Sequence, residues 1–211
     1  MSKRLVRRRD LERAISRIEP HPAPKAYLEQ YTIPSDAAAE ILFTAAYVYD
    51  DIIDKTVIDL GCGTGRLATG AALLGAKEAF GVDVDPLAVK FARRNAEISS
   101  VKALTQWITA DIDSVCGSFD TVVQNPPFGV QRRGADRKFI ETSLRLGRRI
   151  YSLHKAGKDN RAFIKRFIEK RGGTVMSIFT FDMKIPRLFD FHTERAHTVN
   201  VDLYRMKGKN A

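Results

Sequence analysis

The sequence predicts an α/β protein whose mainly parallel sheet is covered by helices on both faces. From residue 56 onward, short apolar strand patterns alternate with amphipathic helix patterns, as in repeated βαβ units. A glycine-rich turn at residues 61–65 joins the first of these strands to a helix. The polar residues Asp83, Asp111 and Asn125 end three further strands. Open α/β sheets bind ligands at this carboxyl edge, so the pattern predicts a binding site there.

Residues 1–34 are predicted to form a basic helix and a proline-rich lead-in. Apolar residues recur at helical spacing among the arginines of residues 3–19. The prolines of residues 20–24 end this helix, because X-Pro units favour an extended backbone. A second helix is expected to begin at Ser35, a good N-cap, with Asp36 in its first turn.

Residues 35–206 are expected to form the catalytic core of a single domain that spans residues 1–211. Strands are expected at residues 56–60, 79–83, 104–110, 121–124, 149–153, 174–181 and 198–205. Further helices are expected at residues 66–74, 86–97, 139–146 and 161–170. Gly75 stops one helix, whereas Asp85 and Pro86 start the next as N-cap and first residue. The two closing strands have an irregular connection, which is compatible with antiparallel pairing.

Composition favours a soluble protein with a nucleic acid partner. Lys and Arg number 35 against 25 Asp and Glu, and the net charge of +10 suits phosphate neutralisation, although a protein can be merely basic. Two cysteines build neither a disulfide framework nor a metal site, so we expect no metal and a reduced, cytoplasmic setting. No apolar stretch reaches the roughly 20 residues of a membrane span. The N-terminus lacks the apolar core of a secretory signal.

A cofactor site is predicted where the first strand meets its helix. Gly61, Gly63 and Gly65 let the backbone turn sharply and approach a ligand, and the helix start offers unpaired N–H groups. Arg66 replaces the last glycine of the dinucleotide pattern, which makes a nicotinamide oxidoreductase the weakest option. For a lone glycine-rich turn, a tight strand-to-helix connection is the simpler alternative.

Polar strand ends strengthen the prediction of a nucleoside-containing cofactor. Asp83, which lies 22 residues after Gly61, can accept hydrogen bonds from both ribose hydroxyls. Asp111 is placed to accept from the adenine amino group, with Ile112 against the ring. Any one of these acidic residues can instead cap a helix or turn, which is the role expected of Asp85.

Asn125, Pro126, Pro127 and Phe128 are predicted to form a catalytic loop. Each proline fixes φ and lacks an N–H, so the segment suits a rigid loop that aims one amide and one ring. An aromatic amine such as adenine N6 is a poor nucleophile, because its lone pair is delocalised. The Asn125 and Pro126 oxygens can hold its two hydrogens and direct the lone pair outward, while Phe128 stacks on the base. A plain turn is the alternative.

These four residues resemble the catalytic loop of amino-methyltransferases that use S-adenosylmethionine. Residues 27–205 resemble the class I S-adenosylmethionine-dependent methyltransferases. The resemblance implies a Rossmann-like, seven-stranded sheet with an antiparallel last strand. It also implies cofactor contacts at Gly61, Thr64, Asp83 and Asp111.

Further stretches resemble the methyltransferase-like protein five group of small-subunit ribosomal RNA adenine-N6 methyltransferases and its archaeal relatives. These stretches are residues 28–31, 59–63, 125–129, 134–136, 151–155 and 201–203. By this resemblance Gln30 lies beside the cofactor and Tyr31 near the target base. Thr32 and Ile33 depart from the Pro-Thr of those relatives, which removes contacts that these two positions make there.

Basic residues near the loop predict contact with RNA as the substrate. Arg132 and Arg133 lie in the loop, and His154 and Lys155 follow a strand end, where a solvated turn is the alternative. The polar face of the helix at residues 161–170 is also almost purely basic. Alternative activities are methylation of a glutamine amide at N5 in a translation factor, or of guanine N2 in RNA. A non-catalytic RNA-binding subunit is a further alternative.

A protein partner is also expected. Members of the resembled group pair with a small zinc-binding activator protein along the exposed edge of the third strand. In this chain that strand, residues 104–110, contains Trp107, the single tryptophan. The resemblance places the activator near Trp107, whereas burial of the ring in the core is the alternative.

Overall fold

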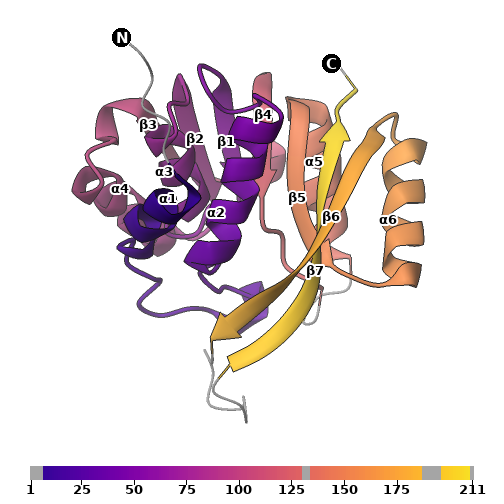
Figure 1. Cartoon of the computed structure of the whole chain (residues 1–211), viewed down its shortest axis with the longest axis horizontal. Coiled ribbons are helices and arrows are strands. Elements are labelled where there is room, and N and C mark those ends of the chain that lie inside the picture. The colour runs from indigo at the N-terminus through magenta and orange to yellow at the C-terminus, as the bar shows by residue number, and fades with distance from the viewer. Residues whose placement is uncertain (1–6, 130–133, 187–195, 210–211) are drawn as a thin grey trace.

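A computed structural model describes residues 7–129, 134–186 and 196–209, arranged around one seven-stranded sheet (Figure 1). The strands are β1 (Thr56–Leu60), β2 (Glu78–Asp83), β3 (Thr105–Thr109), β4 (Phe119–Gln124), β5 (Gly147–Lys155), β6 (Thr174–Pro186) and β7 (Ala196–Lys207). Their order is β3-β2-β1-β4-β5-β7-β6. Strands β1 to β5 pair in parallel, and β7 is antiparallel to both of its neighbours. This confirms the predicted sheet.

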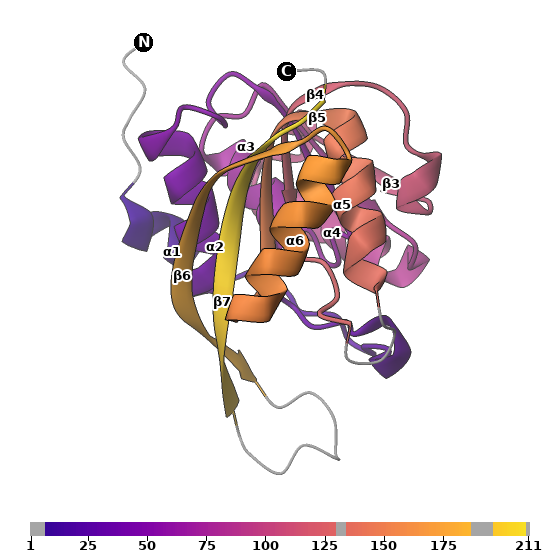
Figure 2. The same ribbon diagram turned by 90° about the vertical axis from the view of Figure 1, so that its right-hand side faces the viewer.

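Helices cover both faces of the sheet (Figure 2). They are α1 (Arg8–Ser16), α2 (Ser35–Phe43), α3 (Arg66–Leu73), α4 (Pro86–Ile98), α5 (Ala135–Leu146) and α6 (Lys158–Lys170). Short turns are η1 (Ala26–Leu28), the π-helical η2 (Thr44–Val48), η3 (Lys102–Leu104) and η4 (Ile112–Ser114). Val57 of β1 packs into the core under α1, α2 and α3, whereas Ile58 packs into the core under α5 and α6. This alternation separates the two layers.

The register of three strands positions the carboxyl edge. Leu60 of β1 pairs with Val82 of β2 on one side and with Gln124 of β4 on the other. The next residue along each chain segment therefore lies at the same level of the carboxyl edge. These residues are Gly61, Asp83 and Asn125, of which Asp83 is the last residue of β2.

The last two strands are longer than the sequence predicts. β6 continues to Pro186 instead of residue 181, and β7 spans residues 196–207 instead of 198–205. The two strands extend beyond the carboxyl edge as a two-stranded ribbon (Figure 1). Backbone pairing sustains this ribbon over polar residues such as Asp182 and Asn200, which face each other in the register. Sequence periodicity misses such a ribbon, because the strand continues where the apolar pattern stops.

Several other bounds also differ from prediction. α5 begins at Ala135 and α6 at Lys158, each one turn or so early, because their polar first turns show no apolar periodicity. β5 includes His154 and Lys155, which pair with β7 and do not form a solvated turn. α1 begins at Arg8 within the described residues.

The division of the chain at residues 34 and 35 marks no structural boundary. Leu11 and Ile15 of α1 are buried in the same core as α2 and α3, so the N-terminal helix packs as part of the core. The single domain over residues 1–211 stays a prediction. Within the described ranges no helix is long and apolar enough to cross a membrane, and no three metal-binding side chains gather at one place.

Trp107 lies on a face of the sheet. Its ring packs over Gly81 of β2 and Gly65 of the glycine turn, where a Cβ would overlap the ring. The indole Nε1–H donates to Thr105 Oγ1 at 3.2 Å. The ring is half-buried and supports the glycine turn. The predicted binding of an activator near Trp107 stays a prediction.

We predict that Gly81→Ala destabilises the protein by about 1–3 kcal/mol, because the new methyl group must displace the indole of Trp107. Urea unfolding measures the change. In a Trp107→Leu background the same substitution should cost clearly less, since the overlapping ring is gone. Strict additivity of the two substitutions would show that the ring does not occupy this position.

Candidate active site

A cavity of about 580 Å³ opens at the carboxyl edge of β1, β2 and β4. Pockets for small ligands commonly have volumes of about 300–1,000 Å³. Ten of the predicted site residues line this one cavity. They are Gln30, Tyr31, Gly61, Gly63, Thr64, Asp83, Asp111, Ile112, Asn125 and Pro127.

The glycine turn forms one wall of the cavity. Gly61 and Gly63 have φ angles of +69° and +53°, a left-handed backbone that other residues rarely adopt. A Cβ on Gly63 would meet no atom within 4 Å, so this position faces open space. Its N–H donates to Asp83 Oδ2 at 2.8 Å. A ligand can therefore approach the backbone closely here.

Asp83 is held in place by two main-chain donors. Besides the Gly63 N–H, the N–H of Asp85 donates to Asp83 Oδ1 at 2.9 Å. Burial raises the pKa of Asp83, although these two hydrogen bonds oppose the shift. The carboxylate is thus fixed at the strand end and lines the cavity, as the predicted ribose contact requires. The contact itself stays a prediction.

Asp85 has a second role that the sequence did not reveal. It caps α4 as predicted, since its Oδ1 accepts from Leu87 N–H at 3.0 Å. Its Oδ2 also accepts from Gln30 Nε2 at 3.0 Å and lies 3.2 Å from His21 Nε2 and 3.1 Å from Lys25 Nζ. Burial acts against ionisation, but the bonds from Gln30 and Lys25 hold the pKa of Asp85 near 2. The buried carboxylate of Asp85 therefore holds three residues of the proline-rich lead-in beside the cavity.

Asp111 and Ile112 lie at the far end of the cavity. Asp111 Oδ1 accepts from Asp113 N–H at 3.0 Å and pairs with Lys138 Nζ at 2.6 Å. The bond from Lys138 lowers the pKa of Asp111. Lys138 itself lines the cavity from α5, which sequence reasoning missed because the polar start of that helix was not recognised. The pair keeps Asp111 ionised, as an acceptor for an adenine amino group requires.

Asn125 receives a hydrogen bond inside the cavity. The Tyr31 hydroxyl donates to Asn125 Oδ1 at 2.9 Å. Burial raises the pKa of Tyr31 well above its usual range, so the phenol stays protonated and can donate. Because the amide oxygen faces Tyr31, the orientation of the amide is set by this bond. The ring centroids of Phe128 and Tyr31 are 6.1 Å apart.

His154 and Lys155 lie outside the cavity. His154 is 2% exposed, its Nε2 lies 2.7 Å from Ser152 Oγ, and burial lowers its pKa to about 3. The predicted substrate contact of His154 is therefore wrong for this structure, because the ring is buried against the ring of Tyr204. Lys155 is exposed at the end of β5 and outside the cavity, so its contact stays a prediction. Arg132 and Arg133 lie outside the described residues.

Asp59 is a further acidic residue in the cavity that sequence reasoning missed. It is 1% exposed, and its Oδ2 accepts from Ala68 N–H at 3.2 Å. Burial, together with the charge of Asp83, raises the pKa of Asp59 well above its usual value. The signal was present as a lone acidic residue in the apolar strand Thr56–Leu60. A buried carboxylate with this environment calls for a cation.

The residues fit S-adenosylmethionine as the cofactor. Asp59 and Asp83 line the cavity and form no ion pair with any cation of the described part of the chain. A cationic ligand would stabilise both. Thr64 adds a hydroxyl with no partner among the described residues, and Asp111 offers an acceptor at the other end.

We predict that Asp59→Asn stabilises the ligand-free protein near pH 7 and weakens binding of S-adenosylmethionine about tenfold or more. The raised pKa means that burying the ionised form is unfavourable. This penalty is absent below the unfolded pKa of about 3.9 and grows as the pH rises through the folded pKa. Thermal unfolding at several pH values and calorimetry check both effects.

Asp10→Asn on the exposed surface of α1 is the control and should change neither quantity. An Asp59→Asn protein that is destabilised at pH 7 and binds the cofactor normally would refute this view of Asp59.

Comparison with known proteins places the chain in a family. The family model for ribosomal protein L11 methyltransferase (PrmA) matches residues 47–126. The rRNA N6-adenosine-methyltransferase Mettl5 of Drosophila melanogaster is 34% identical over 209 residues, which cover 94% of this chain and 95% of that protein. A Pyrococcus horikoshii structure, provisionally assigned as an RNA methyltransferase, is 38% identical with a TM-score of 0.90 and covers 97% of this chain and 99% of its own.

Magnesium protoporphyrin IX methyltransferase from Synechocystis with bound S-adenosylmethionine is 18% identical with a TM-score of 0.59. The match covers 80% of this chain and 79% of that one, and it shows a common fold alone. The full-length relatives decide the family. The chain belongs to the METTL5 family of class I S-adenosylmethionine-dependent methyltransferases.

Proposed function

We propose that this protein transfers a methyl group from S-adenosylmethionine to the N6 amine of an adenine in RNA. The proposed target is small-subunit ribosomal RNA, and the proposed location is the cytoplasm. The observation that carries the proposal is the Tyr31–Asn125 hydrogen bond, which presents an oriented amide oxygen in the cavity that Asp59 and Asp83 also line. The activity named for the METTL5 relatives supports the choice of adenine in ribosomal RNA.

Asn125 would act as an acceptor for one hydrogen of the amine. A carbonyl oxygen has two lone pairs, and Tyr31 uses one of them. The second lone pair of Asn125 Oδ1 can accept from N6–H, and the Pro126 carbonyl can accept the other hydrogen. Holding both hydrogens favours a more tetrahedral nitrogen whose lone pair points away from the ring. Tyr31 is then a positioning residue, because it fixes the direction of the acceptor.

Positioning supplies most of the proposed catalysis. The cofactor provides a methyl group already activated by the sulfonium. The residues of this chain then need to hold the amine in line with that methyl group at near-attack distance. Pro126 and Pro127 restrict the backbone of the loop, and Phe128 offers a ring on which the base can stack. Asp83, Asp111 and the glycine turn would hold the cofactor itself.

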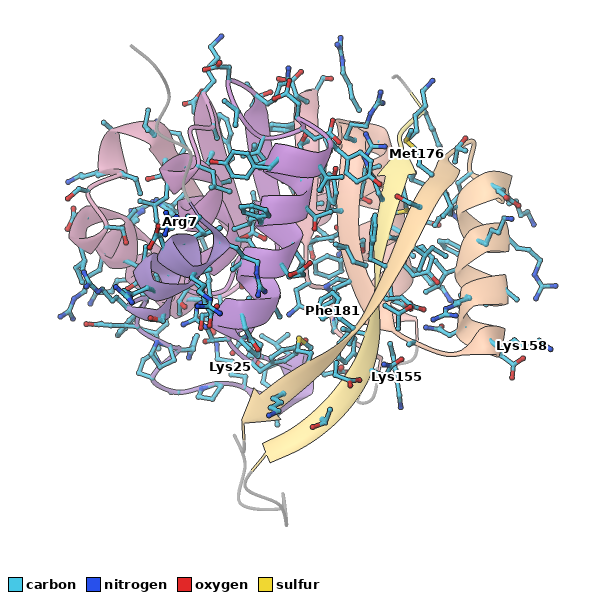
Figure 3. The ribbon with its side chains drawn as sticks, in the orientation of Figure 1. Arg7, Lys25, Lys155, Lys158, Met176 and Phe181 are labelled. Atoms are coloured by element: carbon cyan, nitrogen blue, oxygen red, sulfur yellow. The ribbon has the colours of Figure 1, made fainter. Side chains whose placement is uncertain are left out.

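Basic side chains lie near the proposed entry for RNA. Lys155 and Lys158 lie at the end of the molecule where the parallel strands terminate (Figure 3). Lys25 lies at the same end, but its Nζ pairs with Asp85 Oδ2 at 3.1 Å. Phosphate groups would be attracted to this end without regard to sequence. Arg161 of α6 contributes less than its sequence suggests, because it donates to both carboxylate oxygens of Asp202 at 2.6 and 2.7 Å. An ion pair formed within the protein leaves less charge for RNA.

We predict that Asn125→Ala lowers the turnover number at least about a hundredfold while leaving the affinity for S-adenosylmethionine within about twofold. The lost oxygen contacts the amine and not the cofactor. The assay uses unmodified ribosomal RNA, labelled cofactor and identification of the modified nucleoside, with calorimetry for cofactor binding. Asp10→Asn on the exposed surface of α1 is again the control and should keep full activity.

Wild-type label in N6-methyladenosine supports the proposal, and label in another nucleoside contradicts it. Loss of cofactor binding in Asn125→Ala would contradict the role assigned to this residue. Methylation of protein is the second candidate, favoured by the match of residues 47–126 to a ribosomal protein methyltransferase model. Label on a glutamine amide of a translation factor, with none on RNA, would establish that alternative.

We also propose that a small zinc-binding activator protein binds along the open edge of β3. This strand pairs with β2 on one side, and its other side faces away from the sheet. Leu104, which directly precedes the strand, and Ile108 within it are 39% and 40% exposed. An exposed strand edge with apolar side chains suits strand addition by a partner.

We predict that Ile108→Glu abolishes a complex with such an activator, because it places a charge at the proposed apolar contact. Size-exclusion chromatography of the mixture measures the complex. Val48→Glu, at an exposed apolar residue of η2, is the matched control and should leave the complex intact. A monomer that is stable and fully active with RNA on its own would remove the need for the partner.

A further inference from the structure

Arg66 begins α3 and lines the cavity next to the glycine turn. Its Nη1 donates to the Ile33 carbonyl, and its Nη2 donates to the Ile18 carbonyl at 3.1 Å. Its Nε is buried and has no acceptor among the described residues. Because a guanidinium carries five N–H bonds, the hydrogen-bonding capacity of Arg66 is only partly used.

The charge of Arg66 also lacks a partner within the described ranges. Burial lowers its pKa to about 10, and no neighbouring carboxylate opposes the shift. Arg66 lies in the first turn of α3, where the positive end of the helix dipole also disfavours a cation. A negatively charged ligand group next to the guanidinium of Arg66 would therefore stabilise it.

A second unsatisfied donor lies two residues earlier. Thr64 is 3% exposed and lines the same cavity, and its Oγ1 has no hydrogen-bond partner in the described structure. The N-cap residue Gly65 has no side chain, and Asp59 accepts from one first-turn N–H of α3, that of Ala68. A buried hydroxyl and a half-buried guanidinium, neither of them bonded to an anion in the described structure, thus lie at the beginning of one helix, where anions are favoured.

Opposite charges without ion-pair partners in the described structure occur in the same cavity. Asp59 has no cationic neighbour there, Asp83 has only the electrostatic attraction of His21 and Lys25, and Arg66 lacks an anion. The amino-acid end of S-adenosylmethionine carries one ammonium and one carboxylate group, which matches this distribution. We propose that Arg66 and Thr64 bind the α-carboxylate of S-adenosylmethionine, and that Arg66 thereby selects methyl donors that carry this group. The inference rests on this cofactor and is independent of the molecule that receives the methyl group.

Arg66 also ties the carbonyls of Ile18 and Ile33 to α3, which is a structural role. If this were its whole role, its loss would loosen the cavity wall and weaken every ligand alike. A comparison of two ligands that differ in the carboxylate alone separates the two roles. Decarboxylated S-adenosylmethionine is such a ligand, because it keeps the adenosine, the sulfonium and the amine.

Calorimetry of both ligands tests the proposal. The wild-type protein should bind S-adenosylmethionine about ten- to a hundredfold more tightly than the decarboxylated form, as expected for charge-assisted hydrogen bonds. Arg66→Met should reduce this preference below about threefold. Thr64→Val should reduce it by a smaller factor without loss of stability, because Oγ1 forms no bond in the described structure.

Arg93→Met is the matched control, since Arg93 also donates to a main-chain carbonyl, that of Trp107, but does not line the cavity. It should keep the full preference. Equal affinity of the wild-type protein for both ligands would overturn the proposal, as would an unchanged preference in Thr64→Val and Arg66→Met. Should Arg66→Met fail to fold, the wild-type ratio and Thr64→Val decide the matter. No RNA enters this assay, so failure of the adenine-N6 proposal would appear in the nucleoside product and not here.

Discussion

The register of β1 against β2 and β4 is the constraint on which the site depends. Leu60 pairs with Val82 and Gln124, so the residue after each of these three lies at one level and lines one cavity. Shifting either partner by one residue would turn its side chains to the other face of the sheet. The packing of Trp107 over Gly81 and Gly65 joins the third strand to this arrangement. The positions of the glycine turn and of Asn125, the proposed amine acceptor, thus follow from strand pairing.

The N-terminal lead-in forms one side of the cavity that lies at the carboxyl edge of the sheet. Tyr31 reaches Asn125, Gln30 reaches Asp85, and Arg66 reaches back to the lead-in at Ile33. These contacts close one side of the cavity with polar bonds from a segment that has little regular structure of its own. Such an arrangement couples the cofactor region to the amine site, because the same short segment touches both. Charges left without partners inside the closed cavity then indicate what kind of ligand it accommodates.

Local features of the site could be predicted from the sequence, and long-range contacts could not. Short stretches of sequence were enough to predict the glycine turn, the Asp85 cap and the strand ends at Asp83 and Asn125. Backbone geometry and capping depend on only a few neighbouring residues. The anchoring of Gln30 by Asp85 joins residues 55 positions apart, which no local pattern records. The burial of His154 was missed for the same reason, since it depends on β7 pairing beyond the expected strand end.

We propose that the amide oxygen of Asn125 holds an adenine amine. This contact can be observed in a crystal structure with a bisubstrate analogue, in which a short linker joins adenosine N6 to the cofactor. We expect N6 within about 2.7–3.2 Å of Asn125 Oδ1, with Tyr31 still donating to that oxygen and the base against Phe128. An adenine ring seated away from Asn125, with the cofactor portion still beside the glycine turn, would contradict it.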